Sequence, residues 1–312
     1  MIPGIRDTMF QARQRAKFFY HRNEVDLLRI NLGGLRDAAF INLDRNLYER
    51  EPCKIKINKI IKHLELVNLD STRASIIFVN YCTIQYFRPI IEFLYNNFRG
   101  IYIIDTQDKS ISERPSWINK DSTWAAPHIR TPDLSDGILL PVGLEERRRG
   151  TNNKPHFFDS KVFKSKDILV GPFGPTHASR EVFRRWKSDT VIEVMTDRLR
   201  PAEYAVVASQ FKFVICPRGN GIDTHRIWES LWRGSIPIVL RTPWSIHLSQ
   251  LGIPLYLVDS FEQLYDEKSS DIQSRYLILR KQLDINFSIL TNSYWISRLF
   301  RLHYQKYKEL DY

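Results

Sequence analysis

Gly219 and Gly221 stand close to Arg218 and Arg226 in the segment CPRGNGIDTHRIWESLWRGS, residues 216–235, which precedes an apolar run. A loop that leaves a strand and enters a helix presents backbone N–H groups and the helix dipole to an anion. Gly219 and Gly221 are expected to adopt positive φ and to let the backbone approach a ligand closely. Arg218 and Arg226 flank the loop, so both guanidiniums can converge on one pyrophosphate. The segment therefore predicts a phosphate site.

The helix that follows this loop carries side chains of the kinds expected around a ribose. In the loop itself, Asn220 stands between the two glycines. Asp223 or Thr224 can cap its first turn, and the i,i+4 spacing of His225 and Glu229 puts them on one face. A carboxylate one turn inside the helix can bind the ribose hydroxyls while the phosphates lie at the helix N-terminus. Two alternatives stay open: Glu229 only pairs with a nearby arginine, and His225 is a capping or core histidine.

A second glycine turn, VGPFGPTH at residues 170–177, opens in the same strand–turn–helix manner. Gly174, the hydroxyl of Thr176 and the guanidinium of Arg180 are expected to face the sugar or the β-phosphate. The alternative is a tight turn enforced by its prolines. The segment 195–200 ends the next strand and is placed near the nucleotide base as a hypothesis.

If the phosphate site belongs to an enzyme that transfers a group to a hydroxyl, a further group must take the proton of that hydroxyl. The candidates in the first half of the chain are Asp108, Asp105 and His128, and each has the alternative role of a structural cap. No divalent metal is expected, because arginines and a helix N-terminus can stabilise the charge on the leaving diphosphate. The absence of GxxxxGK[ST], H-E-x-x-H and G-x-S-x-G motifs argues against P-loop, metallopeptidase and serine-esterase chemistry.

Strand and helix patterns alternate along both halves of the chain. In the first half, strands are predicted at 76–79 and 101–104, with a helix at 87–98 between them and a further strand end at 138–143. In the second half, the predicted strands are 168–170, 191–195, 212–216 and 236–240, and the predicted helices are 178–187, 201–209 and 224–233. This βαβ alternation predicts parallel sheets.

A polar run at 145–158 is the best candidate for a linker between two domains. We therefore expect an α/β fold with two Rossmann-like domains facing a cleft. Residues 1–158 would form the domain on the acceptor side, and residues 159–291 the domain that binds the nucleotide sugar. Residues 292–312 are expected to form a closing helix that packs back across the domain junction, with a plain surface helix as the alternative.

The composition is that of a globular protein, with 43% hydrophobic and 12% aromatic residues among 312. Lys and Arg exceed Asp and Glu by 46 − 35 = 11, which favours anionic partners such as nucleotide phosphates and acidic lipid surfaces. Nucleic acid is not expected, because the basic residues are scattered and no binding motif occurs. No signal peptide and no apolar run of about 18 residues is recognised. The expected location is the cytoplasm, with peripheral contact with an anionic membrane.

Residues 216–240, CPRGNGIDTHRIWESLWRGSIPIVL, resemble the core motif of the exostosin-like glycosyltransferases. Residues 103–108 and 140–145 resemble two other landmarks of that family more loosely, and the short chain is similar to its bacterial or viral members. The resemblance implies a metal-independent, inverting transferase of the GT-B type. It also implies that Arg218 and Arg226 hold the diphosphate, that Glu229 binds the ribose, and that Asp223 and His225 shape the phosphate loop.

The sequence thus predicts a hexosyl- or pentosyltransferase that acts in surface polysaccharide or glycan synthesis. Its donor would be a nucleoside-diphosphate sugar, with a UDP-sugar as the first choice, and its acceptor a hydroxyl of a glycan or a lipid-linked oligosaccharide. No cofactor is expected beyond the donor substrate. The alternatives are a nucleotide-sugar epimerase-like enzyme and a non-catalytic protein that binds anions or nucleic acid.

Overall fold

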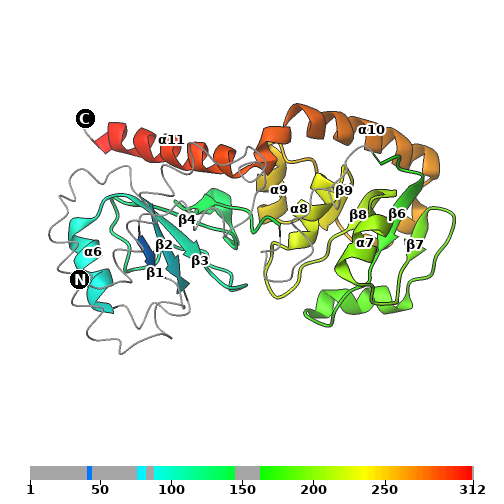
Figure 1. Ribbon diagram of the computed structural model, residues 1–312, viewed down its shortest axis with the longest axis horizontal. Helices are drawn as coiled ribbons and strands as arrows, with labels where there is room; N and C mark the ends of the chain where they lie inside the picture. Colours follow the sequence, from blue (N-terminus) through cyan, green and yellow to red (C-terminus); the bar gives the residue numbers. More distant parts are fainter. Residues whose placement is uncertain (1–40, 44–75, 82–87, 145–161, 311–312) are drawn as a thin grey trace. The chain divides into compact units, whose positions relative to one another are not determined.

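The structure is a computed structural model that describes residues 41–43, 76–81, 88–144 and 162–310. These residues form two compact units, each an α/β structure around a parallel sheet, which is consistent with a Rossmann-like arrangement (Figure 1). The first unit holds the described residues up to Pro141 and those from Asn292 onward, and the second holds the described part of Val142–Thr291. The linker expected at 145–158 lies outside the described residues, and the division between the units precedes it.

The first unit is built on a sheet of five parallel strands in chain order, β1-β2-β3-β4-β5. β2 and β3 pair from Ile76 with Ile101 to Asn80 with Asp105, and the apolar side chains of both strands are almost fully buried. The strands span Ile41–Leu43, Ile76–Asn80, Ile101–Asp105, Thr123–Ala126 and Ile138–Leu139, while helix α6 spans Arg88–Asn97 and the 3₁₀ helix η3 spans Pro132–Leu134. The β-α-β unit predicted over residues 76–104 is confirmed.

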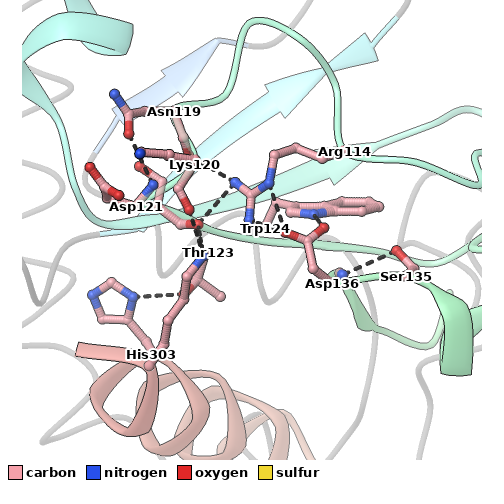
Figure 2. Close-up of polar contacts among 12 residues, drawn as sticks. Arg114, Asn119, Lys120, Asp121, Thr123, Trp124, Ser135, Asp136 and His303 are labelled. Atoms are coloured by element: carbon pink, nitrogen blue, oxygen red, sulfur yellow. Dashed lines mark hydrogen bonds and ion pairs between the residues drawn. The ribbon is translucent and has the colours of Figure 1, made fainter. Parts of the chain in front are cut away.

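Helix α11, Asn292–Leu310, belongs to the first unit although it follows the second in the chain (Figure 1). Trp295 is fully buried, and Nδ1 of His303 lies 2.8 Å from the hydroxyl of Thr123 on β4 (Figure 2). The ammonium group of Lys306 donates to two carbonyl groups of the loop before β4. These contacts fix the helix expected at the end of the chain onto the sheet of the first unit.

Arg114, in the loop before β4, forms an ion pair with Asp136, which precedes β5 (Figure 2). Nη1 of Arg114 donates to the carbonyl oxygen of Asn119 at 2.8 Å, and the carboxylate of Asp136 also accepts from the indole of Trp124 at 2.7 Å. The guanidinium and the carboxylate therefore tie this loop to β4, on which α11 rests.

The second unit is built on another sheet of five parallel strands, in the order β10-β9-β8-β6-β7. Its strands β6 to β10 span Lys166–Val170, Ile192–Val194, Phe211–Ile215, Ile236–Leu240 and Tyr256–Val258. Its α-helices α7 to α10 span Pro201–Ala208, His225–Trp232, Pro243–Gln250 and Ser269–Ile285. Its 3₁₀ helices η6, η7 and η8 span Ala178–Arg185, Phe261–Asp266 and Phe287–Leu290. All four predicted strands are confirmed, and the helix expected at 178–187 is 3₁₀.

The central strands of the second sheet are buried on both faces, as the successive residues Phe213, Val214 and Ile215 of β8 illustrate at 0% exposure. Strands covered by helices on both sides are continuous apolar runs, and for that reason these strands stand out in the sequence. Ile227 and Leu231 of α8 are buried as well. None of the helices that the structure describes is long and apolar enough to cross a membrane.

Candidate functional site

The order of the second sheet reverses between β6 and β8. The chain adds β7 on one side of β6 and then continues with β8, β9 and β10 on the other. In open parallel sheets, ligands bind outside the carboxyl ends of the strands at such a switch point. The turn 171–177 follows β6 and the loop 216–221 follows β8. Both glycine segments identified in the sequence therefore lie at the position where this fold binds ligands.

The two segments lie in contact with each other. A β-carbon built on Gly219 would lie 3.1 Å from Nη2 of Arg180 and 3.5 Å from Oγ1 of Thr176, so a side chain at this position would press on the end of Arg180. The expectation of positive φ at Gly219 and Gly221 is wrong. The left-handed glycine at the switch point is Gly171, with a φ of 82°.

Arg180 joins the two segments through its guanidinium. Nε donates to the carbonyl oxygen of Arg218 at 2.9 Å, Nη1 to that of Gly174 at 3.3 Å, and Nη2 to that of Pro217 at 3.4 Å. These bonds reach both segments and so set the distance between them. Burial and the nearby charge of Arg226 lower the pKa of Arg180, because both disfavour a further cation there.

Arg226 lies in the first turn of α8 and faces the turn after β6. Its Nη1 donates to the carbonyl oxygen of Gly171 at 3.3 Å and its Nη2 to that of Pro172 at 2.8 Å. The guanidinium carbon lies 4.8 Å from the ring centre of Phe173 and 4.9 Å from that of Tyr204. Two aromatic rings thus hold this cation in place, a feature that the sequence analysis missed.

Arg218 makes the fewest hydrogen bonds of the three arginines. Its Nη2 donates to the carbonyl oxygen of Asn220 at 3.2 Å, and its Nε is buried with no hydrogen-bond partner among the described residues. None of Arg180, Arg218 and Arg226 forms an ion pair with a carboxylate in the part of the chain that the structure describes. Three guanidiniums therefore lie around two adjacent turns, and no described carboxylate pairs with them.

His177 is the N-cap residue of η6 and borders this cluster. Its Nδ1 accepts from the backbone N–H of Ser179 at 3.1 Å, which places the proton of the neutral ring on Nε2. Burial, followed by the charges of Arg218 and Arg180, lowers the pKa of His177. The neutral ring adds a hydrogen-bond donor to the site without adding to the repulsion among the cations.

The residues just before α8 hold the loop from inside. Thr224 is the N-cap residue, but its hydroxyl does not make the capping bond that was one of the two alternatives, and it is buried with no partner among the described residues. The buried carboxylate of Asp223 accepts from the backbone N–H of Val142 at 2.8 Å and from the indole of Trp228 at 2.8 Å. Burial raises the pKa of Asp223 to about 7, while these hydrogen bonds act in the opposite direction.

His225 and Glu229 have different surroundings on α8. His225 is exposed, and its Nδ1 lies 2.8 Å from the carbonyl oxygen of Gly143. The side chain of Glu229 is only 11% exposed, and its Oε2 lies 3.7 Å from Nη1 of the buried Arg233. Glu229 thus pairs with a nearby arginine, and its binding to a ribose stays a prediction.

The three candidates for the proton acceptor belong to the first unit. Asp105 ends β3, and Asp108 and His128 follow the carboxyl ends of β3 and β4. Because these strands are parallel neighbours, the residues come together although they are distant in sequence: Oδ1 of Asp108 lies 3.9 Å from Nε2 of His128. The sequence had presented them as separate candidates.

The described residues contain no group of three or more His, Cys, Asp and Glu side chains arranged to hold a metal ion. No family model matches the chain, and no curated protein is significantly similar to it. The resemblance to exostosin-like glycosyltransferases therefore stays a prediction, and function has to be argued from the site itself.

Proposed function

We propose that the chain is a glycosyltransferase that moves a sugar from a nucleoside-diphosphate sugar to a hydroxyl of a glycan or lipid-linked acceptor. The observation that carries the proposal is the cluster of Arg180, Arg218 and Arg226 at the switch point of the second sheet, without a carboxylate partner among the described residues. A diphosphate suits this cluster because it carries several negative charges and many acceptor oxygens. Each guanidinium can donate hydrogen bonds to two such oxygens at once.

The same cluster would assist the reaction. When the bond between the anomeric carbon and the diphosphate oxygen breaks, the leaving diphosphate gains charge, and cations already held in place stabilise it without rearrangement. The buried Nε of Arg218 supplies a donor that the described residues do not use. In this scheme Glu229 binds the ribose, and Gly174 and Thr176 lie beside the sugar or the β-phosphate. The arginines stabilise the charge on the diphosphate, as a metal ion does in other transferases.

The architecture that we propose is the GT-B type, with two Rossmann-like domains facing a cleft. Two α/β units on parallel sheets support this proposal. The second unit would bind the donor, with a UDP-sugar as the first choice, and the first unit would bind the acceptor. The transferred group is a hexose or a pentose.

Calorimetry with UDP, GDP, CMP, dTDP and ADP tests the donor site on the wild type and on Arg218→Gln. Loss of a charge-assisted hydrogen bond should weaken the preferred nucleotide about 10- to 100-fold. Arg184→Gln is the matched control, because Arg184 lies on η6, is 69% exposed and pairs with Glu181. Absence of nucleotide binding by the folded wild type, or equal losses in both variants, would contradict the proposal.

A second comparison tests the role of Glu229. Glu229→Gln should weaken the binding of UDP but leave the binding of inorganic pyrophosphate unchanged, since only UDP carries a ribose. Gln preserves the size of a side chain that is nearly buried. Equal weakening of both ligands would instead show that Glu229 acts through its contact with Arg233.

A further inference from the structure

The turn after β3 has an unusual backbone conformation. Gln107 and Asp108 are consecutive and adopt φ of 45° and 70°, and no other non-glycine residue in the described part of the chain has positive φ. Side chains other than that of glycine rarely adopt this region. Such residues persist where their surroundings hold them, and they concentrate at functional sites.

Hydrogen bonds on both sides hold this turn. Within it, the carboxylate of Asp105 accepts from the backbone N–H of Gln107 at 3.0 Å. Beyond it, the N–H of Ile111 donates to the carbonyl oxygen of His128 at 3.0 Å, and the N–H of Arg130 donates to that of Ile111 at 2.9 Å. The turn is therefore fastened to the segment that follows β4, which is the segment that carries His128.

The two side chains that meet at this point differ in their access to solvent. The side chain of Asp108 is 57% exposed, that of His128 is 2% exposed, and Oδ1 of Asp108 lies 3.9 Å from Nε2 of His128. A ligand can therefore reach the carboxylate of Asp108, whereas the imidazole of His128 is closed to solvent. Asp105 differs from both, since one of its carboxylate oxygens closes the turn.

We propose that Asp108 is the catalytic residue that takes the proton of the acceptor hydroxyl, and that His128 is a positioning residue that holds the carboxylate of Asp108. This inference rests on the proposed sugar transfer. In that step the acceptor O–H bond breaks and its proton passes to the carboxylate of Asp108. The oxygen forms a bond with the anomeric carbon, and the bond from that carbon to the diphosphate breaks, with its electron pair leaving on the diphosphate.

The arrangement separates Asp108 from the other two candidates. Asp105 is needed for the turn that presents Asp108, and its replacement would disturb that presentation without removing the base itself. His128 is too buried to contact an acceptor hydroxyl, but it faces the carboxylate that does. The left-handed turn serves to turn the carboxylate of Asp108 toward solvent while its backbone stays fastened to the strand ends.

The test measures the release of UDP from UDP-glucose, UDP-N-acetylglucosamine and UDP-xylose in the presence of mono- and disaccharide acceptors. Asp108→Asn and Asp108→Gly should lower turnover about 10²- to 10⁴-fold, the usual contribution of a general base. Added formate should restore part of the activity of Asp108→Gly, because it can occupy the space of the lost carboxylate. Glu113→Gln is the matched control: it neutralises another exposed carboxylate of the first unit, leaves the turn intact and should turn over as the wild type does.

A double-mutant cycle tests the role of His128. His128→Gln should lower turnover when Asp108 is present and should lower it no further in Asp108→Gly, since its effect passes through that carboxylate. A merely structural role would lower turnover equally in both backgrounds and would overturn the positioning role.

Calorimetry with UDP keeps this inference distinct from the proposed function. All these variants should bind UDP as the wild type does, because the substitutions are in the first unit. If Asp108→Asn binds UDP and keeps wild-type turnover, the inference is overturned while the donor site stands. A wild type that binds UDP but releases it from none of the three donors would also overturn the inference. A folded wild type that binds no nucleotide would instead overturn the proposed function.

Discussion

Replacement of Asp223 by asparagine should change the pH dependence of folding in the second unit. The carboxylate is 3% exposed and accepts hydrogen bonds from the backbone N–H of Val142 and the indole N–H of Trp228. Asparagine keeps the size of the side chain but turns one acceptor oxygen into a donor. One buried N–H then loses its partner, which should cost about 1–3 kcal/mol at any pH.

The titration of Asp223 adds a second, pH-dependent difference. Burial raises the pKa of this carboxyl group from 3.8 to about 7 in the folded protein. A group with a raised folded pKa binds its proton more tightly when folded, so its contribution to stability is present at low pH and is lost as the pH rises through the folded pKa. The slope is about 1.4 kcal/mol per pH unit. From pH 5 to 8 the advantage of the wild type over Asp223→Asn should therefore fall by about 3 kcal/mol.

Urea unfolding followed by tryptophan fluorescence, at several pH values over that range, measures the difference between the two proteins. Asp197→Asn, which changes an exposed carboxylate of the same unit, is the control and should show no such trend. A difference that stays constant from pH 5 to 8 would refute the reasoning from burial. A difference that grows with pH would show that the N–H donors around Asp223 outweigh burial and favour its charged form.

Two further predictions concern the glycines at the switch point. Gly219→Ala should weaken UDP binding about tenfold without unfolding the protein, because the new β-carbon would lie 3.1 Å from the movable end of Arg180. Calorimetry with UDP measures this change, and equal binding by the wild type and Gly219→Ala would contradict the expectation. Gly171→Ala should lower the free energy of unfolding by about 2 kcal/mol or more, since its φ is 82° and its β-carbon would lie 2.4 Å from the carbonyl oxygen of Met195. An unchanged thermal melt would contradict this last expectation.

The positions of the two turns were predictable from the sequence because each follows a strand buried on both faces. The apolar run of β6 stops at Gly171, and that of β8 is followed by Pro217 and Gly219. The pairing of β6 with β8 in the sheet was not predictable in the same way. Whether β8 pairs with β6 or with β7 depends on how the connecting helices pack, and the local sequence pattern does not contain that information.

The side-chain contacts of the site were less predictable than its position. Arg226 was expected to project its guanidinium toward a ligand, but both of its Nη atoms donate to carbonyl groups of the turn after β6. Its aromatic neighbours, Phe173 and Tyr204, come from two other segments of the chain. Aromatic residues are common in any core, so no spacing rule singles these out. The pairing of Asp108 with His128 escaped notice for the same reason, because it depends on two strand ends that meet only in the folded sheet.

The way the three arginines are held is the reason why we expect the site to favour an anion. Their hydrogen bonds go to carbonyl oxygens, as in the contacts of Arg180 with Gly174 and of Arg226 with Pro172. A carbonyl oxygen orients a guanidinium and satisfies its donors, but it does not neutralise the positive charge as a carboxylate would. Burial, followed by the charge of Arg226, lowers the pKa of Arg180, and only the second of these causes is repulsion between the cations. The arginines already lie in place, so a bound diphosphate would remove that repulsion without a rearrangement of the site. Binding should therefore also stabilise the second unit against unfolding.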